Sequence, residues 1–235
     1  MHSTPVRRRR MARSRIFIAP GARKGVRVIL PYVFDLNDRS LRPLAGNDAG
    51  GTSYIDPCLS PDGTRLAIHR NITLDVDKPS QIGVIDLASG DYTTIGNIIG
   101  GGLHLAWMPD GKHLLMTRGV AGSGHPDNIV CTMDLAGTVT DVCPGDGPVP
   151  LPDGRICFQN ETDKCWRNCA ADGSDSQVCG GGLPGCVMPA RSPDGLRILF
   201  IQHGPDGEHP VIVSTADWSV TPAFALPGNW TSPVW

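Results

Sequence analysis

The stretch SPDGTRLAIHR at residues 60–70 has the pattern of a tight turn followed by a short strand. Proline presets the backbone at the second turn position, aspartate caps the turn, and glycine accepts the positive φ that follows. Residues 65–68 then alternate with the period of two that is typical of a β-strand. This stretch therefore predicts a β-hairpin whose second strand begins at Arg65.

Nearly the same phrase returns three more times along the chain, and its prolines are 48, 43 and 41 residues apart. The other copies are MPDGKHLLMTR at 108–118, LPDGRICFQN at 151–160 and SPDGLRILFIQ at 192–202. A period of this size indicates repeated supersecondary units, each built around one such hairpin.

Each unit continues with a loop and a second apolar segment that is itself divided by a turn. These segments cover 81–95, 128–142, 164–178 and 210–224. One unit is thus a meander of four strands, here named a to d, with PDG between a and b. A sheet with two apolar faces cannot stand alone, and radial stacking of several sheets buries both faces. The sequence therefore predicts an all-β propeller of four-stranded antiparallel blades.

The two ends of the chain fit one shared blade. Residues 14–20 resemble strand b and 27–46 supply strands c and d, while 229–235 match strand a. This phase predicts five blades, closed by N-terminal strands b-c-d and C-terminal strand a. The alternative is a fragment of a six- or seven-bladed propeller. We expect a propeller domain over 14–235 after a disordered basic arm at 1–13.

The charge is divided unevenly along the chain. Residues 1–34 contain nine Lys or Arg and no acidic residue, whereas the remainder is strongly acidic. A basic arm can bind nucleic acid or an anionic membrane. The acidic body argues against nucleic acid as the main partner. No apolar run is long enough to span a membrane, and no signal peptide is legible.

The repeats at 60–63 and 192–195, each followed by an alternating strand, resemble the WD40-like repeats of TolB-type propellers. The resemblance runs from about residue 14 to the end. It implies a protein or peptide partner and a periplasmic or secreted location. TolB-type proteins usually have six blades, a preceding α/β domain and an export signal, and none of these is visible here. The resemblance is specific for fold rather than function.

Seven of the eight cysteines fall between 131 and 186. Three pairs are placed symmetrically about expected turns, so that each pair can face across neighbouring strands at disulfide distance. The candidate disulfides are Cys131–Cys143, Cys169–Cys179 and Cys157–Cys165. Such bonds favour an oxidising compartment. Buried free thiols are the alternative, and the C-x3-C at 165–169 has no second pair that would indicate zinc.

The sequence has no motif for a known catalytic chemistry. No G-x-S-x-G elbow, P-loop, H-E-x-x-H or EF-hand loop is present, and the GGG runs at 100–102 and 180–182 precede strands rather than helices. No Ser, His and Asp are spaced to suggest a triad. We therefore expect no cofactor and no metal site, and the absence of such motifs favours a non-enzymatic role while an enzyme stays an open alternative.

One face of the propeller is expected to bind. In a meander the b–c and d–a connections emerge on one side, called the loop face here. The b–c loops are expected to be long and dissimilar, and they cover 69–80, 117–128 and 202–210. Variable loops on a rigid frame commonly carry binding residues. Counting back from each PDG places one set of residues at the mouth of the channel and a second set one ring inward. The mouth set is Tyr54, Gly102, Gly145, Cys186 and Trp230, and the inner set is Asp56, His104, Gly147, Met188 and Ser232.

The candidate binding residues follow from these sets and from two of the loops. They are Tyr54, Asp56, His104, Trp230, Asp75, Asp77 and His125. The leading hypothesis is a monomeric, non-enzymatic scaffold that holds a protein or peptide on the loop face. The alternatives are a small propeller enzyme, a lyase or glycan-acting protein with His104 in the channel, and a truncated propeller of a larger protein.

Overall fold

The computed structural model describes residues 14–23, 26–35, 39–44, 54–70, 79–98, 104–119 and 128–223. Within these ranges the chain forms one three-stranded sheet and four four-stranded sheets, all antiparallel. None of the described residues belongs to a helix long and apolar enough to cross a membrane. The prediction of an all-β fold built from four-stranded antiparallel meanders is confirmed.

Every sheet uses strands that are consecutive in the chain. The first two sheets contain β1 (Ser14–Arg23), β2 (Val26–Asp35) and β3 (Leu41–Pro43), then β4 (Tyr54–Leu59), β5 (Arg65–Arg70), β6 (Ser80–Asp86) and β7 (Tyr92–Ile98). The third contains β8 (Ala106–Trp107), β9 (His113–Arg118), β10 (Ile129–Asp134) and β11 (Val139–Pro144). The fourth contains β12 (Asp146–Pro150), β13 (Ile156–Gln159), β14 (Trp166–Cys169) and β15 (Gln177–Val178), followed by the 3₁₀ turn η2 (Gly180–Gly182). The fifth contains β16 (Cys186–Arg191), β17 (Arg197–Gly204), β18 (Gly207–Ser214) and β19 (Val220–Pro222).

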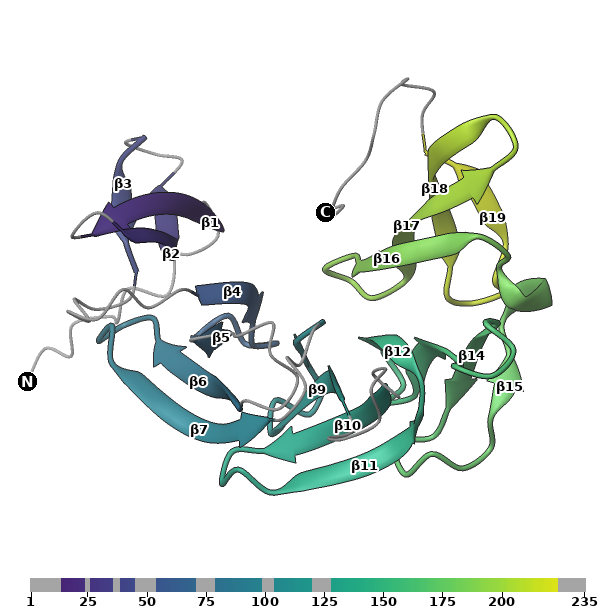
Figure 1. The fold of residues 1–235 in the computed structure, drawn as a ribbon, viewed down its shortest axis with the longest axis horizontal. Coiled ribbons are helices and arrows are strands. Elements are labelled where there is room, and N and C mark those ends of the chain that lie inside the picture. Colours follow the sequence, from purple (N-terminus) through teal and green to yellow (C-terminus); the bar gives the residue numbers. More distant parts are fainter. Residues whose placement is uncertain are drawn as a thin grey trace, which may run out of the picture.

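The five sheets stand side by side in an arc (Figure 1). Strands β4, β12 and β16 lie along its inner edge, and β7, β11 and β19 lie outside (Figure 1). The first sheet has the three strands expected of b, c and d. Residues 229–235, the expected fourth strand, and the arm at 1–13 lie outside the described residues. Ring closure and the number of blades therefore stay predictions.

The hairpin that opens each repeat is closed by its own side chains. The Asp62 carboxylate accepts hydrogen bonds from the Ser60 hydroxyl at 2.6 Å and from the Thr64 amide at 3.0 Å. Gly63 has φ 68° and donates its N–H to the Ser60 carbonyl at 2.8 Å. The same arrangement recurs around Ser192 and Asp194. The positive φ is the reason why this position is glycine.

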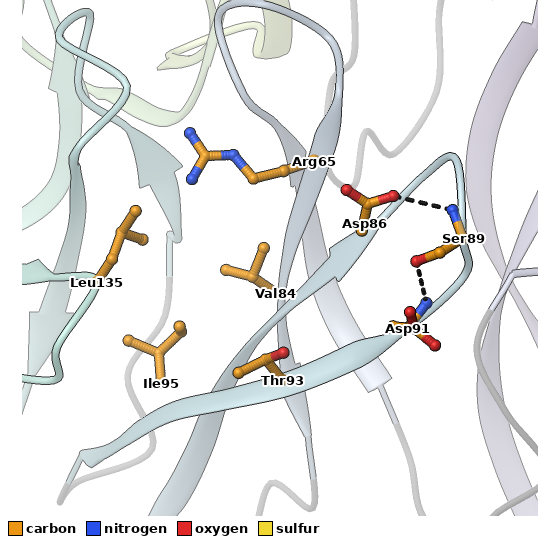
Figure 2. A pocket seen from close by; sticks show the side chains of 8 residues that line it. All are labelled: Arg65, Val84, Asp86, Ser89, Asp91, Thr93, Ile95 and Leu135. Carbon is orange, nitrogen blue, oxygen red and sulfur yellow. Dashed lines mark hydrogen bonds between the residues drawn. The ribbon is translucent and has the colours of Figure 1, made fainter.

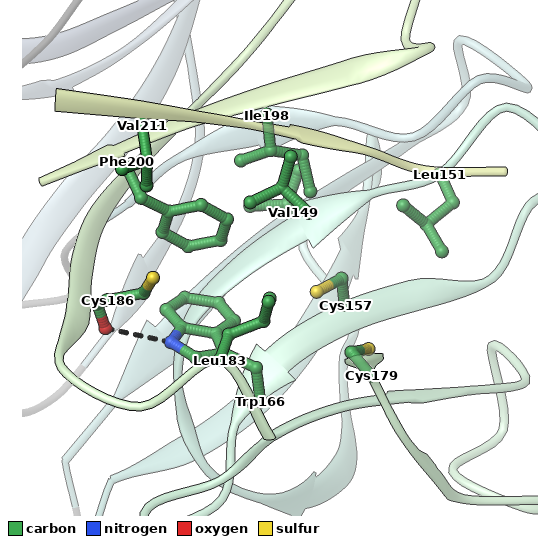
Figure 3. Close-up of a cluster of buried hydrophobic side chains, with 11 residues drawn as sticks. Val149, Leu151, Cys157, Trp166, Cys179, Leu183, Cys186, Ile198, Phe200 and Val211 are labelled. Carbon is green, nitrogen blue, oxygen red and sulfur yellow. Dashed lines mark hydrogen bonds between the residues drawn. The ribbon is translucent and has the colours of Figure 1, made fainter. Parts of the chain in front are cut away.

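Four apolar clusters fill the spaces between successive sheets, because the inner strands are buried on both faces. The cluster between the fourth and fifth sheets is built around Trp166, whose ring meets Phe200 edge-on at 4.7 Å (Figure 3). The Trp166 indole N–H also donates to the Cys186 carbonyl at 2.8 Å. This bond satisfies the polar edge of a side chain that is only 1% exposed.

The b–c connection of the fifth sheet is shorter than the sequence suggests. Strands β17 and β18 extend to Gly204 and Gly207, which face each other across a tight turn at 205–206. The expectation of a long loop over 202–210 is therefore wrong. Its GPDG segment is itself a hairpin turn, for the same reason as the PDG turns between strands a and b.

The three predicted disulfides are not formed, and all eight cysteines are free thiols. The strand register explains the first of these errors. Cys131 lies opposite Asp141, and a bulge after Val130 places that residue opposite Cys143. The regular pairs from Met133–Val139 to Cys131–Asp141 centre the hairpin on Ala136 rather than on Gly137, so the symmetry assumed for Cys131 and Cys143 is wrong.

The other two pairs fail for the same kind of reason. Cys157 lies opposite Asn168, and the Cys179 amide donates to the Trp166 carbonyl rather than approaching Cys169. Cys169 instead joins the cluster between the third and fourth sheets, where its thiol lies against Cys143. The cysteines thus give no structural support for an oxidising compartment.

Two c–d turn glycines join neighbouring sheets. A Cβ added to Gly137 would lie 2.5 Å from the Ile95 carbonyl oxygen of the preceding sheet, and one added to Gly173 would lie 2.3 Å from that of Val142. Gly90, in the corresponding turn of the second sheet, also has positive φ but has nothing within 4 Å. Backbone contact between sheets therefore requires glycine at 137 and 173.

We predict that Gly137→Ala lowers the free energy of unfolding by about 3 kcal/mol, because it combines backbone strain with a clash. Gly90→Ala is the matched control and should cost only about 1 kcal/mol, from positive φ alone. Urea unfolding of both variants measures the difference. Equal losses would show that the contact at Ile95 adjusts without cost.

Candidate functional site

The inner edge of the arc carries one residue in a left-handed backbone conformation in each of the four four-stranded sheets. Each lies at the same distance before its PDG turn, in or beside the innermost strand. They are Asp56 (φ 49°), His104 (φ 64°), Gly147 (φ 59°) and Met188 (φ 52°). Register shifts interrupt β4, β12 and β16 at these points. A left-handed residue in a strand produces such a bulge and turns its peptide group out of the ladder.

The bulges direct backbone amides toward carboxylates. The His104 N–H donates to Asp56 Oδ2 at 3.1 Å, which links the second and third sheets. The Gly147 N–H donates to Asp146 Oδ1 at 2.7 Å in the fourth sheet. Both carboxylates are therefore held in place by the same backbone feature.

His104 lies between these two carboxylates. Its Nε2 is 4.0 Å from Asp146 Oδ1, and its side chain is 34% exposed. Asp146 also accepts a hydrogen bond from the Thr117 hydroxyl of β9 at 3.0 Å. Groups from three consecutive sheets thus converge at one place, nearer to the loop face than to the PDG turns.

His69 completes this group from strand β5. It lies opposite Ile55, the neighbour of Asp56 in the chain. Arg65 and Ala67 face the third sheet, where the Arg65 guanidinium lies over the Trp107 ring at 4.7 Å and Ala67 joins the cluster around that ring. Alternation along the strand points His69 the same way. We refer to Asp56, His69, His104, Thr117 and Asp146 as the inner-edge site.

Burial shifts two of these groups toward their neutral forms. Burial raises the pKa of Asp56, against the opposing effects of nearby His104 and of its amide. Burial also lowers the pKa of His69 to about 4, and the neighbouring His104 acts in the same direction. Both shifts follow from the cost of holding a charge away from water.

The structure brings together only part of the predicted set. Asp56 and His104 meet, as described above. Tyr54 is 2% exposed and packs edge-on against Tyr92, so its side chain belongs to the core. Met188 is 43% exposed, without a described role in the site. The remaining candidates, Asp75, Asp77, His125 and Trp230, lie outside the described residues and stay predictions.

Sequence reasoning missed the contributions of His69, Thr117 and Asp146. His69 and Thr117 occupy the same position of strand b in successive repeats, where the fifth sheet has Ile201. Polar side chains at an otherwise buried strand position were the available signal. Asp146 precedes the bulge position, and only the backbone turn at Gly147 brings its carboxylate to His104.

Two cavities lie on the opposite side of the sheets, at equivalent places between neighbours. One of about 410 Å³ lies between the second and third sheets and is lined by Arg65, Val84, Asp86, Ser89, Asp91, Thr93, Ile95 and Leu135 (Figure 2). The other, of about 420 Å³, lies one interface further along the arc. In the first cavity the Asp86 carboxylate binds the amides of its own turn, and Arg65 binds the Gly111 carbonyl. These charges are already used in the fold.

Metal binding has little support in the described part of the chain. No group of three or more His, Cys, Asp or Glu side chains there is arranged to hold a metal ion. The contacts observed at the inner-edge site are hydrogen bonds to Asp56 and Asp146 and the approach of His104 to Asp146.

The depressed pKa of His69 predicts a pH dependence of stability. The unfolded chain protonates near pH 6.5 and the folded protein only near 4. Neutral His69 therefore contributes about 3 kcal/mol to the free energy of unfolding above pH 6.5, and this contribution is lost as the pH falls toward 4. His69→Leu should remove this loss, so the unfolding free energies of the two proteins should diverge over this range.

Chemical denaturation at several pH values tests this expectation. Asp56 and His104, which lie close to His69, are present in both proteins. The raised pKa of Asp56 acts in the opposite sense, since that group stabilises the fold as it becomes protonated. His209→Leu, at an exposed histidine, is the control for loss of an imidazole. Parallel curves for wild type and His69→Leu would contradict the prediction.

No protein-family model and no curated protein match the chain by sequence. Solved structures match its fold. TolB from Acinetobacter baumannii is 18% identical with TM-score 0.63, and the match covers 83% of this chain and 48% of that one. A putative TolB from Agrobacterium tumefaciens is 20% identical with TM-score 0.67, and the match covers 90% and 81%. An oligogalacturonate lyase in complex with manganese is 16% identical with TM-score 0.59, and the match covers 91% and 63%.

The chain thus spans about half of the first TolB and most of the second. At these identities the comparisons establish the fold and leave the activity open. Together with four antiparallel meanders of four strands, they show that this chain has the β-propeller fold of the TolB type.

Proposed function

We propose that the chain is a non-enzymatic scaffold that binds a protein or peptide through its loop face. The observation that carries the proposal is the inner-edge site, where Asp56, His104 and Asp146 of three sheets converge. The side chains of His104 and Asp146 are 34% and 36% exposed, so they are accessible to a ligand. Polar groups that converge on a rigid frame are typical of binding sites.

The residues of the loop face support a macromolecular partner. Asp75, Asp77, His125 and Trp230 belong to segments that connect or follow the blades, and the expectation that they contact the partner stays part of the proposal. The TolB-type fold is compatible with protein partners. An extended peptide that enters along the inner edge would meet the ring of bulges and their carboxylates.

Selection from a random peptide library displayed on phage tests the proposal, because it does not require the natural partner to be identified first. We expect enriched peptides whose binding is lost in the double variant His104→Ala, Asp146→Asn. Asp153→Asn, at an exposed PDG turn, should bind them unchanged. Thermal melting confirms that each variant is folded. Enrichment that is indifferent to the double variant would place binding elsewhere and contradict the proposed face.

An enzyme with His104 as its proton-transfer group is the second candidate. The observation that favours it is the position of that imidazole between two carboxylates, which suits general acid–base chemistry. A solved structure with this fold is a lyase. Incubation with pools of oligosaccharides and metabolites should then show turnover that His104→Ala abolishes. Absence of turnover across such pools would reject this candidate.

A further inference from the structure

The two carboxylates of the inner-edge site lie near a histidine and have no guanidinium or ammonium partner among the described ion pairs. They belong to Asp56 and Asp146, and the histidine is His104. Asp110 and Glu208 likewise pair with a histidine, whereas four other acidic residues form close pairs with a guanidinium or an ammonium group. Those pairs are Asp141–Arg118, Asp163–Arg167, Asp175–Arg155 and Glu161–Lys164.

His69 is a second and independent observation that points to a ligand. The residue is 0% exposed, and among the residues that the structure describes neither ring nitrogen has a hydrogen-bond partner. A buried polar group without a partner is uncommon, since it has lost water and gained nothing in return. Its strand position points it toward the third sheet, where His104 is close enough to act on its pKa.

The next repeat shows how a polar side chain at the position of His69 can obtain a hydrogen-bond partner. Thr117 occupies the place of His69 in the third sheet, and its hydroxyl donates to Asp146 of the fourth sheet at 3.0 Å. The partner therefore comes from the neighbouring sheet in one interface. In the other, the described residues provide no such partner for His69. His69 lies beside Asp56, whose carboxylate is also partly buried.

We propose that the inner-edge site binds an alkylammonium group, the lysine side chain of a bound peptide, between Asp56, Asp146 and the ring of His69. An ammonium group has three donors and no acceptor, whereas two carboxylates and a neutral imidazole nitrogen all accept. Its charge compensates the two carboxylates that lack a cationic partner. The long apolar stem of lysine lets the charged group reach a recessed position.

This inference rests on the proposed function, because it names the chemistry of the peptide that the scaffold holds. An inorganic divalent cation is the competing occupant. It is disfavoured because the described residues offer no group of three ligands in a suitable arrangement.

Titration with N-acetyl-lysine methylamide, followed by NMR of the ¹⁵N-labelled full chain, tests the proposal. The uncharged control probe is N-acetyl-norleucine methylamide, which has the same apolar stem. We expect saturable shifts of the His104 amide and the His69 ring with the lysine probe alone. Equal responses to the two probes would overturn the proposal, as would binding of calcium at these resonances with no response to lysine.

Variants separate the charges from the imidazole. Asp56→Asn and Asp146→Asn should each weaken binding of the lysine probe by at least about tenfold. Asp153→Asn makes the same change of charge at an exposed PDG turn and should bind normally. His69→Leu should also weaken binding of the lysine probe, because leucine has no polar group. The variant should remain folded at neutral pH, because leucine fills the space of the imidazole. If Asp153→Asn weakens binding of the lysine probe equally, the effect reflects only the change in net charge, and the proposal is overturned.

The two proposals fail separately. Suppose that the selected peptides bind the loop face without a preference for lysine, and that the lysine probe causes no chemical-shift changes. This result would overturn the proposed lysine site but support the proposed peptide scaffold. A lysine probe that binds the inner-edge site, with no peptide selected, would reject the scaffold and retain the cation site.

Discussion

The structure depends on one constraint, which is that each sheet has two apolar faces and must be covered on both. Leu66 and Ile68 of β5 face the first sheet, while Ala67 of the same strand faces the third. Burial of one such large side chain contributes about 2 kcal/mol, so an isolated sheet would leave much of its stabilisation unrealised. Stacking in chain order follows from this requirement, and the arc in Figure 1 is its geometric result.

Close stacking determines what the joints between sheets are made of. Gly137 and Gly173 leave room for the backbone of the preceding sheet. Arg65 ties two PDG turns together through the Gly111 carbonyl. The many aspartates serve mainly inside their own turns, and hydrogen bonds from Ser60 and Thr64 lower the pKa of Asp62 to about 2. The acidic character of the chain is therefore largely a consequence of its turn chemistry.

The polar groups at the inner edge differ from the turn aspartates, because they do not bind mainly within their own turns. Asp56, His104 and Met188 hold a left-handed backbone without being glycine, and this costs conformational energy. The bulges persist because the flanking ladder pairs hold them on either side. Their effect is to turn amides and carboxylates toward the inside of the arc. Left-handed backbone at a recurring position, together with a buried His69 that has no hydrogen-bond partner among the described residues, is the basis on which we propose that this edge binds a ligand.

The period of the PDG phrase, the turn glycines and the alternation of the strands were sufficient to predict the repeated four-stranded sheets. These signals are local, since a turn and the strand after it are encoded by adjacent residues such as Asp62, Gly63 and Arg65. The same spacing also placed Asp56 and His104 on one inner ring. It did not predict the cysteine neighbours, because the hairpin that contains Cys131 is centred on Ala136 rather than on Gly137, and a displacement of the turn by one residue changes every pair across it.

The partners within the site were likewise beyond local reasoning. The contact of His104 with Asp146, the hydroxyl of Thr117 and the unpartnered ring of His69 join residues from different sheets. By itself the sequence determined the repeating unit and the kind of surface that such units present. Only the tertiary structure decided which side chains meet at the inner edge, because that depends on how one sheet packs on the next.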